Sequence, residues 1–141
     1  MKITSGTDTD MEIFLTAVGE HLGKIGAEAT IDLYTDTEID EPEPNRLLVA
    51  MQQAALADST GRGGGDPYMG VPLDLTTSDG LTDFARLAHR TIGCEAFLGR
   101  KLVFTTIENE RMVCLDLPDG DVEALEAQAR HAGATTLSHV A

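Results

Sequence analysis

A group of carboxylates between residues 34 and 45 offers the clearest chemistry in this sequence. The segment YTDTEIDEPEPN has five acidic residues and no base. The five are Asp36, Glu38, Asp40, Glu41 and Glu43. Tyr34 and Ile39 lie among them, so that charge for steering a partner and apolar surface for anchoring it occur together. The segment predicts a docking surface for a basic protein partner, and a solvated turn between a strand and a helix is the simpler alternative.

A glycine-rich segment, STGRGGGDPYMG at residues 59–70, could in principle hold a phosphate or close over a ligand. A phosphate loop needs a strand before it, a helix after it and a Lys-Ser/Thr ending. Here a predicted helix precedes the glycines, a predicted strand follows them, and that ending is missing. We therefore expect a flexible connector, with a lid over a small-molecule site as the alternative. Arg62, Tyr68 and Met69 are its candidate contact residues, and the last two could also anchor its end to the domain.

The sequence assigns no metal site, cofactor or catalytic residue. Its four histidines, His21, His89, His131 and His139, are scattered, and Cys94 and Cys114 stand 20 positions apart. None of the spacings typical of zinc sites appears. Cys114 falls in a strand with apolar residues on both faces, which predicts a buried structural thiol. The nucleophile motif G-x-S-x-G is also missing. Enzymatic activity is left uncertain, with a non-catalytic role as the favoured interpretation.

Charge is the strongest global feature of the 141-residue chain. It has 24 acidic and 10 basic residues, for a net charge of −14. Residues 1–45 alone carry 11 acids against two bases, a net charge of −9. This balance should repel nucleic acid phosphates and anionic membranes and should attract basic proteins. Mimicry of DNA by rows of carboxylates is the extreme form of this idea. The sequence has no long apolar run and no signal-peptide pattern, so we expect a cytoplasmic protein.

The periodicity of apolar residues predicts an alternation of helices and strands. Helical spacing occurs over 9–25, 44–58, 78–92 and 119–133. Thr9 with Glu12 and Ser78 are the predicted N-caps, and Gly26 ends the first helix. Strand-like alternation occurs over 2–5, 27–34 and 71–77, in a hairpin over 101–118, and over 134–140. Pro72 predicts an edge strand, Phe97 and Leu98 are expected on a further turn, and the hairpin is expected to be covered on both faces.

These elements predict one α+β (α/β) domain with a mixed β-sheet over residues 1–141. An acidic strand–helix–strand–helix part spans 1–57, the glycine-rich loop spans 58–70, and residues 71–141 follow in the ferredoxin-like βαββαβ order. This order hosts many functions, so function must come from a site. The first hypothesis is a small acidic binding protein, acting as an inhibitor, immunity-type factor or regulator of a basic protein. The alternatives are a small-molecule-binding or enzymatic domain with residues 59–70 as a lid, and a self-associating structural protein.

Overall fold

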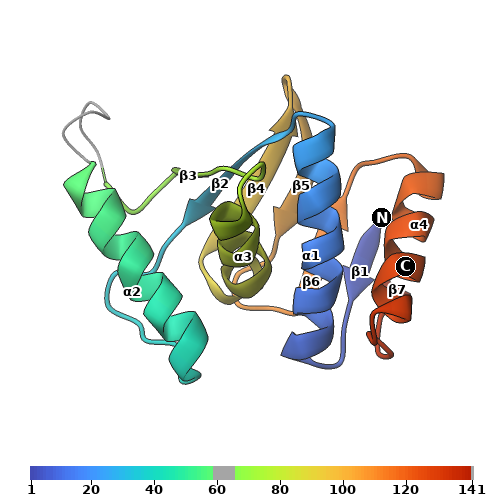
Figure 1. Ribbon diagram of the computed structural model, residues 1–141, viewed down its shortest axis with the longest axis horizontal. Helices are drawn as coiled ribbons and strands as arrows, with labels where there is room; N and C mark the ends of the chain where they lie inside the picture. The colour runs from blue at the N-terminus through green and yellow to red at the C-terminus, as the bar shows by residue number, and fades with distance from the viewer. Residues whose placement is uncertain (59–65, 141) are drawn as a thin grey trace.

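The computed structural model describes residues 1–58 and 66–140, which form a seven-stranded sheet with helices beside it (Figure 1). The strands are β1 (Lys2–Thr4), β2 (Glu28–Asp32), β3 (Val71–Leu73), β4 (Gly93–Leu98), β5 (Lys101–Thr106), β6 (Met112–Leu115) and β7 (Ser138–Val140). The helices are α1 (Asp8–Lys24), α2 (Pro42–Ala57), α3 (Ser78–Leu87), the 3-10 turn η2 (Ala88–Arg90) and α4 (Asp119–His131). The predicted α+β class is thus confirmed. No helix in the described ranges is both long enough and apolar enough to cross a membrane.

The sheet has the strand order β3-β2-β4-β5-β6-β1-β7, and every neighbouring pair is antiparallel. It is therefore antiparallel where the sequence predicted a mixed sheet. The ferredoxin-like order is not confirmed, because Phe97 and Leu98 end strand β4 instead of lying on a turn. Residues 71–140 consequently contain three consecutive strands between α3 and α4. Pro72 lies in β3 at the sheet edge, as predicted, where its missing N–H breaks no ladder.

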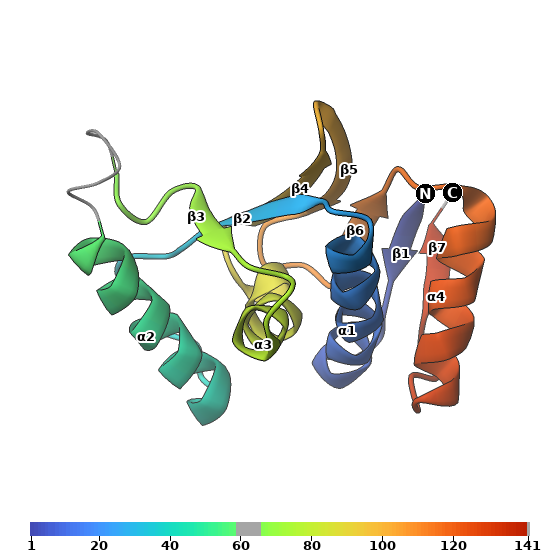
Figure 2. The same ribbon diagram turned by 45° about the horizontal axis from the view of Figure 1, so that its top comes forward.

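The α-helices all lie on one side of the sheet, and the core forms between the two layers (Figures 1 and 2). Helix α1 runs across the middle and packs against both α3 and α4. Its buried face includes Phe14 and Leu22, and it is the apolar face that the helical spacing of residues 9–25 predicts. The N-cap is Thr7 and not the predicted Thr9, because the Thr7 side chain accepts a 3.1 Å hydrogen bond from the Asp10 N–H. Gly26 follows its end with φ of +80°, as the helix-stop prediction requires.

No helix of the described ranges lies on the opposite face of the sheet, which corrects the expectation that the hairpin is covered on both sides (Figure 2). Leu102 on β5 is 39% exposed there, and Phe97, its cross-strand partner on β4, is 36% exposed. Cys114 on β6 is only partly buried, so its predicted burial is also wrong. Cys94 is the fully buried thiol, and burial raises its pKa. Antiparallel sheets commonly leave one face to solvent, and apolar residues on both faces do not reveal this.

Two buried carboxylates away from the candidate site tie helices to the end of the chain. The Asp10 carboxylate accepts hydrogen bonds from the Thr135 N–H at 3.1 Å and from the Thr136 N–H at 2.9 Å. Glu126 on α4 pairs with His139 of β7 at 2.5 Å and with Arg130 at 3.2 Å. Both groups therefore hold the short edge strand β7 and the segment before it against the helices.

Asp83 on α3 makes stability depend on pH. Burial raises the pKa of Asp83 to about 6, the charge of Asp79 adds to this shift, and Arg46 opposes it. Because the folded-state pKa lies above the unfolded value, the folded protein binds this proton more tightly, and stability falls as pH rises from about 4 through 6. At neutral pH the folded protein must keep the Asp83 carboxylate charged in a partly buried place, and Asp83→Asn removes this unfavourable free energy. After allowance for solvent screening, we expect it to stabilise the protein by about 1 kcal/mol at pH 7.5.

Urea unfolding of Asp83→Asn and of the unsubstituted protein at pH 7.5 and pH 4.5 measures this effect. The gain should shrink as pH falls toward 4. The exposed variant Glu123→Gln on α4 serves as the control, because it removes a carboxylate whose environment is solvent. An equal gain from Asp83→Asn at both pH values would show that its ionisation is not the cause.

Candidate functional site

Connections from distant parts of the sequence meet at one end of the sheet. Asp32 at the end of β2 pairs with Gly93 at the start of β4, so the β2–α2 loop and η2 leave the sheet close together. The turn between β5 and β6 lies at the same end, because Thr106 pairs with Val113. Its Asn109 N–H donates to the Thr91 carbonyl at 3.3 Å, which joins the turn to the segment after η2. The start of α1 completes the group through the Ser5 N–H, which donates to the Arg111 carbonyl.

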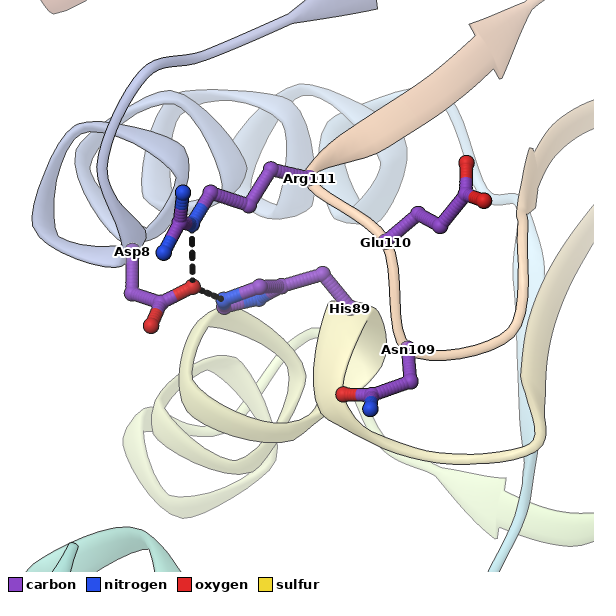
Figure 3. Close-up of a pocket in the computed structure, with 5 residues that line it drawn as sticks. All are labelled: Asp8, His89, Asn109, Glu110 and Arg111. Atoms are coloured by element: carbon purple, nitrogen blue, oxygen red, sulfur yellow. Dashed lines mark hydrogen bonds and ion pairs between the residues drawn. The ribbon is translucent and has the colours of Figure 1, made fainter.

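Two adjoining hollows lie between these connections and share Asp8 and Asn109. The first, called here the histidine pocket, has a volume of about 480 Å³. Its lining is Asp8, His89, Asn109, Glu110 and Arg111 (Figure 3). The second, called here the acidic pocket, has a volume of about 240 Å³. Its lining is Asp8, Tyr34, Thr37, Glu38, Ile39, Asp40, Glu41, Arg90 and Asn109.

Asp8, at the first residue of α1, stands between the two pockets and binds both arginines. Its Oδ1 accepts a 2.9 Å hydrogen bond from the Arg111 Nε, and its Oδ2 lies 3.6 Å from the Arg90 Nη2. Burial works against ionisation of Asp8, but the Arg111 hydrogen bond and the positive charges of both arginines outweigh it, so the pKa of Asp8 is lowered. Its position at a helix N-terminus also favours the negative form. Asp8 is therefore a permanent anion in the wall between the pockets.

Arg90 is a buried guanidinium surrounded by carboxylates. Its side chain is 8% exposed and donates hydrogen bonds to the carboxylates of Glu12 on α1 and Glu41 before α2. A further bond runs from its Nη1 to the Arg86 carbonyl at 3.1 Å. Together with Asp8, one positive charge thus faces three negative charges. Arg90 thus links α1, the β2–α2 loop and η2, and its hydrogen-bond donors are engaged within the molecule. It is a structural cation. The net charge of the side chains that line the acidic pocket stays negative.

His89 is the buried polar side chain of the histidine pocket. Its side chain is 1% exposed, and its Nε2 lies 3.4 Å from the Asp8 Oδ1. Burial lowers the pKa of His89 to about 4, the Arg90 charge lowers it further, and Asp8 opposes both. The imidazole is therefore neutral at pH 7. Neither ring nitrogen has a hydrogen bond within the described part of the chain, because the contact with Asp8 does not meet hydrogen-bond geometry.

The acidic pocket gathers most of the residues that the sequence predicted for partner binding. Tyr34, Glu38, Ile39, Asp40 and Glu41 all line it. The Ile39 side chain packs partly against the core, and its N–H donates to the Asn45 Oδ1 at 2.9 Å. The Tyr34 hydroxyl donates to the Glu108 Oε1 at 3.1 Å. Burial, that hydrogen bond and the Glu108 charge together raise the pKa of Tyr34, so the phenol keeps its proton.

The remaining predicted residues of the described ranges line neither pocket. Asp36 is exposed in the loop, and Glu43 pairs with Arg86 at 3.4 Å. Tyr68 packs partly against the core, and its carbonyl accepts a 2.9 Å hydrogen bond from the Leu33 N–H. Met69 beside it is 41% exposed. Arg62 and the glycines at 61–65 lie outside the described residues, so the connector and lid interpretations of that segment stay predictions.

Sequence reasoning missed the residues that come from other elements. Asp8, Arg90, Asn109 and Arg111 belong to three separate segments, α1, η2 and the β5–β6 turn, and only folding brings them to the acidic loop. One signal was present in the sequence: His89 and Arg90 are adjacent polar residues that directly follow the apolar stripe of α3. In an acidic chain, an arginine that continues a buried helix face must find carboxylates. Asn109 has a φ of +51°, which is uncommon outside glycine and fits its place in a tight turn.

The exposed carboxylates of the acidic pocket can accept a cation. Glu38 and Asp40 are exposed and have no hydrogen bond or ion pair with other residues of the described ranges. No serine or cysteine occurs among the described residues that line either pocket. No group of three or more His, Cys, Asp or Glu in the described part of the chain is placed to hold a metal ion. Carboxylates beside a phenol and an isoleucine can accept an ammonium or guanidinium and contact its aliphatic stem.

Comparison with known proteins gave no match to a family model, to a curated protein or to a solved structure.

Proposed function

We propose that this chain is a cytoplasmic binding protein whose acidic pocket takes up a basic side chain of a protein partner. The observation that carries the proposal is the pair Glu38 and Asp40, which are exposed and unpaired within the described residues. They line one small hollow together with Tyr34 and Ile39. A partner with a lysine or arginine there would be inhibited or regulated by occupation of its basic surface.

The size and charge of the acidic pocket favour a single side chain. Its volume of about 240 Å³ lies below the range of roughly 300–1,000 Å³ that is typical of small-molecule sites. Four carboxylates line it, from Asp8, Glu38, Asp40 and Glu41, and Arg90 is the one cation among its described lining residues. A guanidinium is the better ligand, because its planar donors suit carboxylates and its stem can lie against Tyr34 and Ile39.

The affinity of a fluorescently labelled hexa-arginine peptide tests the proposal. Every acidic protein attracts this probe, so the comparison must hold net charge constant. We expect Glu38→Gln/Asp40→Asn to bind about tenfold more weakly than the unsubstituted protein, because each lost partly screened ion pair contributes up to about 1 kcal/mol. Binding should also weaken steeply as salt rises.

The matched control is Glu20→Gln/Glu123→Gln, which removes the same charge from exposed positions on α1 and α4. It should bind the peptide nearly as well as the unsubstituted protein. Equal losses in the two double variants would mean that the peptide senses only overall charge, and the acidic pocket would then have no special role.

A second candidate function follows from His89. A neutral, buried imidazole borders a cavity of about 480 Å³, and neither of its nitrogens makes a hydrogen bond among the described residues, although Nε2 lies 3.4 Å from the Asp8 carboxylate. Such groups normally have a partner, which here would be a small polar molecule that both donates and accepts hydrogen bonds. Its signature is a shift of the His89 ring resonances in NMR spectra on addition of neutral polar metabolites. Shifts confined to residues 34–41 on addition of hexa-arginine favour the first function instead.

A further inference from the structure

The β4–β5 hairpin ends in a basic, apolar tip. Phe97, Leu98 and Leu102 are 36%, 41% and 39% exposed. Between them stand Arg100 and Lys101, two adjacent bases in a chain that has only 10 bases. Gly99 begins the two-residue turn with φ of +63°, whereas Arg100 is not among the positive-φ residues. This pattern matches a tight type II′ hairpin turn, which presents the tip rigidly.

The hairpin tip lies at the opposite end of the sheet from the β2–α2 loop (Figure 1), and that loop supplies most of the lining of the acidic pocket. Strand β4 starts at Gly93, which pairs with Asp32 beside the β2–α2 loop, and it ends at Leu98, which pairs with Lys101 at the tip. A strand of six residues spans roughly 17–20 Å. One molecule therefore cannot place its own tip in its own acidic pocket.

We propose that the hairpin tip, residues 97–102, of one copy docks into the acidic pocket of a second copy. This inference rests on the proposed function and names the basic partner as the same chain. The tip carries the positive charge and apolar side chains that complement the acidic pocket. Arg100 would pair with Glu38 and Asp40, while Leu98 would pack against Tyr34 and Ile39. Charge and apolar surface are thus complementary between two places on one molecule.

Other binding partners suit the hairpin tip less well than a second copy of the chain. A net charge of −14 opposes the approach of an anionic membrane or of nucleic acid. The same net charge also repels a second copy at long range. At physiological salt, however, charges farther apart than about 8 Å are largely screened, whereas contacting pairs with apolar neighbours are screened less. Association of copies should accordingly be stronger at 150 mM salt than at 10 mM salt.

Tip and pocket are different surfaces of one molecule. Two copies can therefore dock reciprocally into a two-fold dimer with two tip–pocket contacts, or copies can continue head to tail into a ring or an open chain. In each case a copy with a blocked pocket can still bind through its tip to a copy with a blocked tip. This property allows a test that needs no other partner.

Two blocked variants make the test. The pocket-blocked variant carries Glu38→Lys and Asp40→Lys and keeps its tip. The tip-blocked variant carries Leu98→Ser, Arg100→Ser and Lys101→Ser and keeps its pocket. Since the altered tip is neutral, it gains no attraction to the altered pocket. All five side chains are exposed, so both variants should fold. Sedimentation velocity at about 150 mM salt over a concentration series measures mass.

We expect the unsubstituted protein to form species that grow with concentration, and each blocked variant alone to stay at its monomer mass of about 15.0 kDa. An equimolar mixture should give a heterodimer of twice that mass and nothing larger, because both of its free ends are blocked. The controls Glu123→Lys and Lys24→Ser change charge at exposed sites elsewhere and should assemble normally.

Three results would overturn the inference: a strictly monomeric unsubstituted protein, assembly that survives either block, or blocked variants that do not pair when mixed. Hexa-arginine binding separates these failures from failure of the proposed function. If the peptide still depends on Glu38 and Asp40, the acidic pocket docks a basic group of another protein and only the self-association is wrong. If that dependence is also missing, both proposals are wrong.

Discussion

Arg90→Met should destabilise the protein by about 3 kcal/mol, although methionine has a similar shape and is apolar. Removal of one partner from a buried ion pair typically costs 3–5 kcal/mol, because the other partner stays without compensation. Here three carboxylates, Asp8, Glu12 and Glu41, lose their shared cation. The side chain of Glu41 is 51% exposed and can recover hydration, so the lower part of that range is expected. Urea unfolding followed by circular dichroism measures the loss.

Two further variants identify the cause. Arg86→Met removes an arginine whose side chain is 35% exposed and whose carboxylate contacts are 3.4 and 3.9 Å long, so it should cost less than about 1 kcal/mol. Adding Glu12→Gln and Glu41→Gln to Arg90→Met should restore much of the lost stability, because it removes the unpaired charges. The role given to Arg90 would be contradicted if Arg90→Met and Arg86→Met lost the same stability. It would also be contradicted if the added glutamine substitutions restored none of the stability lost in Arg90→Met.

Gly80→Ala should also destabilise the protein by about 3 kcal/mol, which reverses the usual benefit of alanine in a helix. Gly80 lies in the first turn of α3, where its N–H donates to the Thr77 hydroxyl at 3.0 Å. A Cβ at this position would lie 1.8 Å from the Asp74 carbonyl oxygen. That atom belongs to the backbone and accepts a hydrogen bond from the Thr77 hydroxyl, so it cannot rotate away. The helix would have to move, and with it the buried Phe84.

Gly120 in the first turn of α4 provides the matched control. A Cβ added there meets no other atom within 4 Å among the described residues. Gly120→Ala should therefore be neutral or stabilising by about 0.5 kcal/mol, through the lower entropy of the unfolded chain. Thermal unfolding of both variants distinguishes steric conflict from helix propensity. Similar midpoints for Gly80→Ala and Gly120→Ala would contradict the close approach of α3 to the Asp74 backbone.

The periodicity of apolar residues predicted helices and strands best where the periodic segment was long. The stripe of α1 from Met11 to Leu22 and the alternation in β2 determine one buried face each, and both are observed. Strand β4 was missed because its alternation covers only six residues and begins with a glycine that also resembles a helix stop. That single omission changed the predicted order of residues 71–140.

Part of the candidate site could likewise be predicted from the sequence, and part could not. The acidic loop is continuous in sequence, so its composition predicted five of the residues that line the acidic pocket. The opposite wall comes from Asp8, Arg90 and Asn109, which lie far apart in the chain and meet only because α1, η2 and the β5–β6 turn end at the same edge. The exposure of Cys114 and Leu102 depends on which face the helices cover, which periodicity does not determine.

An NMR titration of isotope-labelled protein with unlabelled hexa-arginine tests the central claim most directly. If the acidic pocket takes up a basic side chain, the largest amide shifts fall at Tyr34, Glu38, Ile39 and Asp40, with smaller shifts at Asn109 across the pocket. Salt should reduce them together, and Glu38→Gln/Asp40→Asn should abolish them. Shifts of similar size at Glu20 and Glu123, two exposed carboxylates on α1 and α4, would contradict the claim and show that the peptide only samples an acidic surface.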